Sequence, residues 1–212
     1  MNFSTLKTRT LQKLNESTSS PNFWSLVEIG DFLNEGYSDL ASITKIIETS
    51  ATLSLVANQY IYSLDSSCLK INRMYYETDD RIIKPATWAD INKQDRWWNE
   101  TSFDYPKFWV PISTQKIFLW PKPIENESSC ITYYFSSLST DMSDDNDTPA
   151  GPDVFHSALI DFACAMALLR KRNSEAMAKS KYFYEQYKEK RVKITNHKAN
   201  RANRTPRVRT WA

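Results

Sequence analysis

Glycine is the residue that this sequence lacks most: its 212 residues include three, Gly30, Gly36 and Gly151, where average usage gives about 15. A loop that cradles phosphate needs several glycines close together, because its backbone takes positive φ or approaches the ligand closely. The nucleotide-binding motifs G-x-G-x-x-G and G-x-x-x-x-G-K-S/T are both missing. We therefore expect no phosphate-binding loop of either kind.

Histidine and cysteine are also scarce. Two histidines, His156 and His197, leave little for zinc binding or for acid–base catalysis. The cysteines Cys68, Cys130 and Cys164 are odd in number and form no C-x-x-C pair, so we expect reduced thiols. His156 and Cys164 are about 12 Å apart along a helix, too far for a nucleophile–base hydrogen bond. We expect structural roles for both, no catalytic or metal site, no cofactor and no enzymatic activity.

Long apolar runs are absent as well. The best, Phe162 to Leu169, is much shorter than the roughly 18 residues that suggest a membrane span. The first residues have no apolar core of signal-peptide length. We expect a protein made in a cytoplasm, without membrane contact.

Charge is divided unevenly along the chain. Residues 1–169 hold 13 Lys and Arg against 22 Asp and Glu, a net charge of −9, whereas residues 170–212 hold 14 against 3, a net charge of +11. This division is typical of a basic tail that meets an acidic partner, protein or nucleic acid. A solvated cationic helix face with a frayed end is the alternative.

Apolar spacing predicts helices in the N-terminal part. Residues 3–14 form a candidate short helix, and apolar residues recur every three or four positions from Trp24 to Ile47, which indicates a helix of about six turns. Gly30 and Gly36 lie inside this helix at a cost of about 1 kcal/mol each. We therefore expect another helix to approach closely there.

Two more helices are expected after residue 150. Asp153 is a candidate N-cap for a helix from Val154 to about Lys171. Its small residues 163–167 permit tight contact, which we expect against Gly30 or Gly36 of the earlier helix. A more polar helix from Ser174 to about Val192 follows, and from Asn196 we expect disorder in the free protein.

The period changes to two between the helical parts. Short β-branched and aromatic runs bounded by Asn, Asp, Ser and Pro predict antiparallel strands at 53–55, 60–64, 69–74, 82–83, 116–120 and 130–135. Thr87 to Ile91 is typical of one helical turn, and an irregular aromatic stretch follows from Arg96 to Val110. Its tryptophans can fill the core or form an assembly interface. The acidic segment 141–147 lacks the glycine and the glutamate of a calcium loop, so we expect a solvated loop.

These patterns predict an α+β fold: a helical bundle built from N- and C-terminal helices, with an inserted antiparallel β domain and a basic C-terminal tail. The expected segments are 1–50 (helical), 51–140 (β), 141–187 (helical) and 188–212 (tail). The tail can neutralise phosphates of a nucleic acid or bind an acidic protein surface with Trp211 as an anchor. No recognition helix for DNA sequence is present. The candidate partner-binding residues are Lys190, Arg191, Lys193, Lys198, Arg201, Arg204, Arg207, Arg209 and Trp211.

Several short motifs occur in a familiar order over about residues 22–172. They are the Trp24 helix with Leu33-Asn34-Glu35, the Tyr60-x-Tyr-x-Leu64 strand, Thr87-Trp88, the Trp98 to Pro106 stretch, Ile117 to Pro123, and Ile131-Thr-Tyr-Tyr134. In this order and spacing the chain resembles the phage head–tail adaptor, or connector, family, including the podovirus-type tubular ring proteins beneath the portal.

This resemblance implies a structural virion protein at the head–tail junction, assembled as a homo-oligomeric ring, commonly of twelve copies. It implies the portal protein and the next tail or ring protein as partners, with double-stranded DNA passing through the channel during ejection. The C-terminal segment would then reach the portal, and the acidic body would suit a channel wall along which DNA slides.

Two other functions compete with the adaptor interpretation. A nucleic-acid-binding protein would use the cationic tail, and its affinity would fall steeply with salt. A tail-associated hydrolase would need convergent carboxylates. Nothing in their spacing favours the candidates Glu77, Asp79, Asp80, Glu100 and Asp104.

Overall fold

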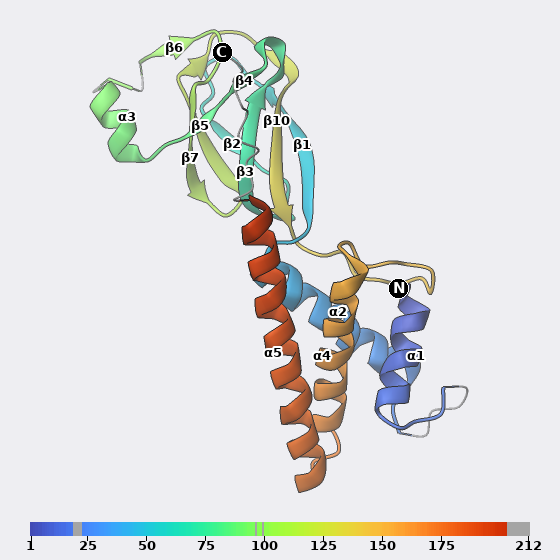
Figure 1. The fold of residues 1–212 in the computed structure, drawn as a ribbon. Coiled ribbons are helices and arrows are strands. Elements are labelled where there is room, and N and C mark those ends of the chain that lie inside the picture. Colours follow the sequence, from blue (N-terminus) through green and yellow to red (C-terminus); the bar gives the residue numbers. More distant parts are fainter. Residues whose placement is uncertain (19–22, 96, 99, 203–212) are drawn as a thin grey trace, which may run out of the picture. The chain divides into compact units, whose positions relative to one another are not determined.

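The chain divides into two compact units. The computed structural model describes residues 1–18, 23–95, 97–98 and 100–202 (Figure 1). One unit, here the helical unit, comprises residues 1–47 and the chain from residue 139 onward; the other, the β unit, comprises residues 48–138. The fold is α+β, with N- and C-terminal helices flanking an inserted β region, as the sequence predicts.

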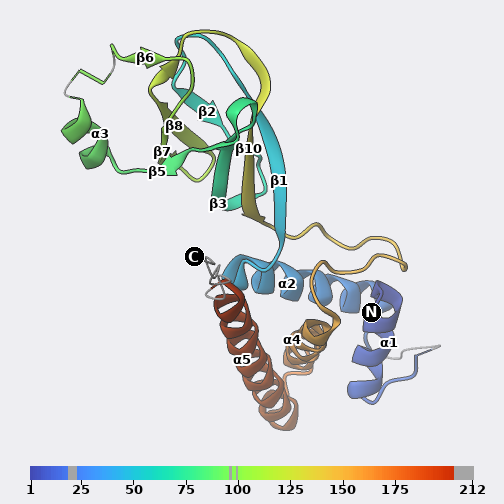
Figure 2. The same cartoon turned by 45° about the horizontal axis from the view of Figure 1, so that its top comes forward.

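The helical unit contains four of the α-helices in the described part of the chain. They are α1 (Phe3–Lys13), α2 (Leu26–Thr44), α4 (His156–Leu169) and α5 (Ser174–Ala202). A 3-10 turn, η2 (Asp153–Phe155), precedes α4. Helices α4 and α5 lie side by side and α2 crosses them (Figure 1 and Figure 2).

Helix α2 begins where a capping box satisfies its first free N–H groups. The Ser25 hydroxyl accepts a hydrogen bond from the Glu28 N–H at 3.1 Å, and the Glu28 carboxylate accepts one from the Ser25 N–H at 3.0 Å. The helix ends at Lys45, which has a left-handed backbone. These local signals explain why the helix is confined to the middle of the predicted apolar stripe.

Both glycines of α2 lie where another helix comes close, as expected. A Cβ atom at Gly36 would be 2.7 Å from Cδ1 of Phe162, so α4 approaches α2 there as predicted, but through Phe162 and not through the small residues 163–167. A Cβ atom at Gly30 would be 3.0 Å from Cζ of Phe3, so the neighbour there is α1.

Helix α4 is buried almost throughout and forms the centre of the helical core. His156 and Cys164 are both buried in it, and burial raises the pKa of the Cys164 thiol to about 12. The prediction that Asp153 caps this helix is wrong. The 3-10 turn moves the helix start to His156, and the Asp153 carboxylate instead accepts a hydrogen bond from the Met1 ammonium at 2.7 Å.

Helix α5 extends further than the sequence predicts. It continues for ten residues past Val192, so the expected disorder from residue 196 is wrong for the part up to Ala202. Its buried stripe reaches Ile194, which is 2% exposed. No glycine or proline interrupts the polar residues that follow. Burial of Ile194 therefore anchors the helix beyond the point where its apolar pattern fades.

The β unit is built from ten short strands in the described residues. They are β1 (Glu48–Leu55), β2 (Ile61–Ser63), β3 (Cys68–Tyr76), β4 (Arg81–Ile82), β5 (Lys84–Pro85), β6 (Ser102–Phe103), β7 (Phe108–Ser113), β8 (Lys116–Trp120), β9 (Lys122–Pro123) and β10 (Glu127–Ser137). A 3-10 turn, η1 (Glu77–Asp79), and helix α3 (Trp88–Gln94) complete it. The strands form one sheet in the order β1-β10-β3-β4, another in the order β2-β8-β7-β5, and the pair β6-β9.

Alternating side chains of the two four-stranded sheets build the core of the β unit. Met74 and Ile131 of one sheet and Leu119 of the other are fully buried in it. A smaller cluster centred on Ile91 packs α3 against Phe118. The longer strands pair antiparallel as predicted, whereas β5–β7 and β6–β9 pair in parallel, which the sequence did not indicate.

Candidate docking surfaces

Lys190, one of the candidate partner-binding residues, lies in an ion-pair network inside the helical unit. The Asp161 carboxylate of α4 is 2% exposed and accepts hydrogen bonds from Lys13 Nζ of α1, at 2.5 Å, and from Lys190 Nζ of α5. Lys190 also donates to the Ser157 carbonyl oxygen at 3.3 Å. A buried carboxylate needs such partners, because an unpaired charge there is costly. Lys190 therefore holds α5 on α4.

Arg191, the next residue of α5, forms an ion pair with another helix of the same unit. Its Nη1 lies 3.4 Å from Oδ2 of Asp39 on α2, and the Tyr187 hydroxyl donates to the same oxygen. Burial raises the pKa of Tyr187, so the phenol stays protonated and remains a donor. Arg191 and Tyr187 thus fasten α5 to α2.

The remaining candidate residues lie beyond these anchors. Lys193 is exposed and forms no ion pair within the described ranges. Lys198 and Arg201 belong to the last turns of α5. Arg204, Arg207, Arg209 and Trp211 lie outside the described residues. The structure therefore separates two inward-facing anchors from a cationic segment that begins at Lys193.

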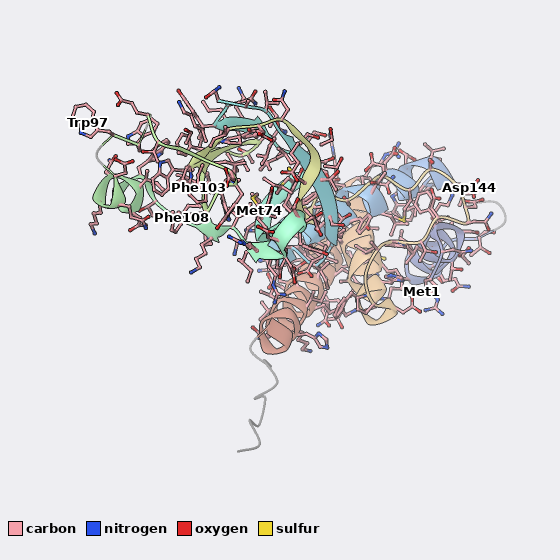
Figure 3. The ribbon with its side chains drawn as sticks, turned by 90° about the horizontal axis from the view of Figure 1, so that it is seen from above. Met1, Met74, Trp97, Phe103, Phe108 and Asp144 are labelled. Atoms are coloured by element: carbon pink, nitrogen blue, oxygen red, sulfur yellow. The ribbon has the colours of Figure 1, made fainter. Side chains whose placement is uncertain are left out.

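The acidic loop 141–147 holds the start of α1. The Asp147 carbonyl oxygen accepts a hydrogen bond from the Phe3 N–H at 2.7 Å, and the Asp145 carboxylate pairs with Lys7 at 2.5 Å. Hydrogen bonds from the backbone N–H groups of Asp144 and Ser143 lower the pKa of the Asp147 carboxyl. Figure 3 shows Asp144 at the surface of this unit. The loop therefore acts as a brace for α1.

The structure does not assemble the candidate hydrolase carboxylates into a site. Asp79 pairs with Arg81 at 3.2 Å on the exposed η1 turn, where Glu77 also lies. Glu100 and Asp104 are exposed on either side of β6. In the part of the chain that is described, no group of three or more His, Cys, Asp or Glu is placed to hold a metal ion.

The tryptophans divide between core and surface. Trp24 is 1% exposed and donates from Nε1 to the Ala167 carbonyl oxygen at 3.1 Å. Trp120 is buried beneath α3, whereas Trp97 is 66% exposed and projects from the edge of the β unit (Figure 3). Trp97 is therefore an exposed aromatic of the kind that assembly interfaces use.

The outward face of α2 is a surface that the sequence reasoning missed. Asp31 and Glu35 are exposed there, one helical turn apart, next to Val27, which is 73% exposed. Helix α2 contains four acidic residues and no Lys or Arg, a signal that was readable in the sequence. Its other acids, Glu28 and Asp39, pair with arginines of the same chain.

A family model described as SU10 adaptor protein matches residues 1–210, which include both units and nearly all of the cationic tail. The chain belongs to the SU10 adaptor protein family. The predicted resemblance to a phage head–tail adaptor is thereby confirmed. No curated protein in the comparison matches the chain.

Membership of the SU10 adaptor family makes the chain a phage structural adaptor that contacts other head or tail proteins of the virion. The family is not known for enzymatic activity. Among the helices of the described residues, none has the length and apolar character needed to cross a bilayer.

Proposed function

We propose that the protein forms a ring beneath the portal, commonly of twelve copies, that connects the head to the tail and extends the DNA channel at the neck of the virion. The family match over nearly the whole chain carries this proposal. Its partners would be the portal protein above and the next tail or ring protein below, with double-stranded DNA passing through the ring during ejection.

The end of α5 supports a role in portal docking. Residues 190–212 contain no Asp or Glu, so their cations have no acid of the same segment to pair with. The pairs of Lys190 with Asp161 and of Arg191 with Asp39 fix the helix from which this segment extends. We assign docking to the segment after these anchors, which comprises Lys193, Lys198, Arg201, Arg204, Arg207, Arg209 and Trp211.

A mixing experiment with portal rings of the same virus tests the proposal. The full chain and a chain truncated after Asn196, which keeps Ile194 and both anchors, would be titrated onto portal and followed by size exclusion with light scattering. We expect the full chain to saturate portal at a fixed number of copies, and the truncated chain to need about tenfold higher concentration or more. Equal loading of the two chains would show that the tail is not the portal anchor.

Nucleic-acid binding by the same tail is the second candidate function. Each phosphate contact made by a lysine or arginine releases counterions, so the affinity would fall steeply as salt rises. A full chain that fails to load on portal but retards DNA at low salt, with loss of retardation after truncation, would replace the adaptor proposal with this one.

A further inference from the structure

Helix α2 carries a charge pattern that the isolated chain leaves uncompensated. Asp31 and Glu35 stand at positions i and i+4, where like charges repel and cost a few tenths of a kcal/mol. Both are exposed, and neither forms an ion pair within the residues that the structure describes. A pair of like charges that lowers the stability of its own helix, with no compensating contact inside the chain, indicates a surface that binds a partner. The partner that relieves this repulsion must be cationic.

Helix α5 presents a cationic stripe on its own outward face. Met177, Lys181, Lys188 and Val192 are spaced at i, i+4, i+11 and i+15, which places them on one side of the helix. Met177 and Val192 are each 56% exposed. Lys188 pairs with Glu185 of the same helix at 3.1 Å, where both are about half exposed, and its Nζ lies 4.8 Å from the centre of the Tyr184 ring. An exposed pair of this kind contributes little and can be exchanged.

The first charges of the two stripes align when their helices run antiparallel. From Val27, the residues Asp31 and Glu35 follow about 6 and 12 Å along the axis of α2. From Val192, running backwards, Lys188 and Lys181 follow about 6 and 16 Å along the axis of α5. An exposed apolar residue thus starts each stripe, and charges of opposite sign follow at similar spacing.

Neither stripe faces the core that α2 and α5 share within one chain. The buried Leu33 lies on the side of α2 opposite to its stripe, and the buried Tyr187 lies about 100° around α5 from Lys188. One copy therefore cannot close this contact with itself. A contact between two different faces is head-to-tail, and it generates a ring when the rotation closes.

We propose that the outward stripe of α5, formed by Met177, Lys181, Lys188 and Val192, packs antiparallel on the outward stripe of α2, formed by Val27, Asp31 and Glu35, of the next copy. This inference rests on the proposed ring and names the surface that joins its neighbours. The apolar ends supply buried area, and the charges fix register and exclude wrong pairings.

Charge reversal with rescue tests this contact on portal rings. One variant carries Asp31→Lys and Glu35→Lys, a second carries Lys181→Glu and Lys188→Glu, and a third carries all four changes. We expect each two-residue variant to need about tenfold more protein or more for half-loading, because like charges then face each other across the contact. The four-residue variant restores opposite signs, and we expect it to load within about threefold of the wild type.

A matched control changes net charge by the same amount elsewhere. Asp104→Lys with Glu125→Lys reverses two exposed acids of the β unit and is expected to load like the wild type. Circular dichroism and size exclusion of each variant before mixing show that the helices are retained. Loss of loading in this control would show that net charge, and not the contact, governs assembly.

The outcomes separate this inference from the proposed function. If the wild type does not load on portal, the ring proposal falls and the contact falls with it. If the wild type loads and both two-residue variants load equally well, only the contact is wrong. Weak loading of the two-residue variants without rescue in the four-residue variant would likewise contradict the pairing of these two faces.

Discussion

Gly36 is a residue at which an added Cβ atom would collide with the core of the helical unit. A Cβ atom there would lie 2.7 Å from Cδ1, 3.0 Å from Cγ and 3.2 Å from Cβ of Phe162, so the base of that side chain would have to move. Gly36→Ala gains about 1 kcal/mol of helix propensity but overpacks the core at a cost of about 1–3 kcal/mol. We expect a net loss of about 0–2 kcal/mol in the free energy of unfolding, measured by urea denaturation.

Gly30→Ala is the matched control for this substitution. Its Cβ would meet only the far end of the Phe3 ring, at 3.0 Å, and that ring can shift by a few tenths of an ångström. We expect a change within about 0.5 kcal/mol, because the gain in propensity offsets the adjustment. Equal losses in both variants would contradict the closer approach of α4 to α2.

At the scale of elements, α5 is held by charge as well as by apolar contact. Asp161→Asn removes the negative charge that joins Lys13 and Lys190 and leaves one acceptor oxygen, and we expect a loss of about 1–3 kcal/mol, because the ion pairs and one of the two hydrogen bonds are lost. Both lysines are partly exposed and regain water, which keeps the loss below that of a fully buried pair. Chemical denaturation followed by circular dichroism measures it.

The exposed pair of Lys179 and Glu175 provides the comparison within the same helix. Its side chains are 61% and 76% exposed, so we expect Lys179→Met to change the free energy of unfolding by less than about 0.5 kcal/mol. If this substitution costs as much as Asp161→Asn, burial is not what makes the Asp161 network important.

Sequence patterns predicted the elements whose signals are local. Helix α2 has an apolar stripe and a capping sequence, and the longer strands have period two, so each was found. Strands of two residues, such as β6 and β9, have no period to read, and their parallel pairing depends on tertiary contacts. The extension of α5 depends on the burial of Ile194, which a polar sequence does not reveal.

The candidate site was only partly readable for a related reason. Charge composition located the cationic end of the chain, but it does not predict which of its side chains face the core and which face solvent. Lys190 and Arg191 face inward because Asp161 and Asp39 lie on helices distant in sequence. Asp161 follows an apolar run, and nothing in the sequence there predicts which lysines pair with it. The exposed pair Asp31 and Glu35 was readable, since α2 has no cation of its own.

At the scale of the whole molecule, the β unit is a continuous segment inserted into a discontinuous one. Its two core clusters contain only residues from 48–138, and the helical core contains only residues from the flanking segments. A segment that has its own core, and whose first and last residues lie close together, has what it needs to fold alone. We therefore expect residues 48–138, expressed separately, to show a cooperative thermal transition and dispersed amide resonances.

The helical unit should behave differently when the chain is cut. Residues 1–47 alone lack α4, the centre of their core, and are expected to show no cooperative transition. Within the separate β unit, Met74→Ala removes a fully buried side chain and should cost about 2–5 kcal/mol. A separate β unit without a cooperative transition would show that its strands require the flanking helices, because the buried clusters would then be insufficient to hold the two sheets together.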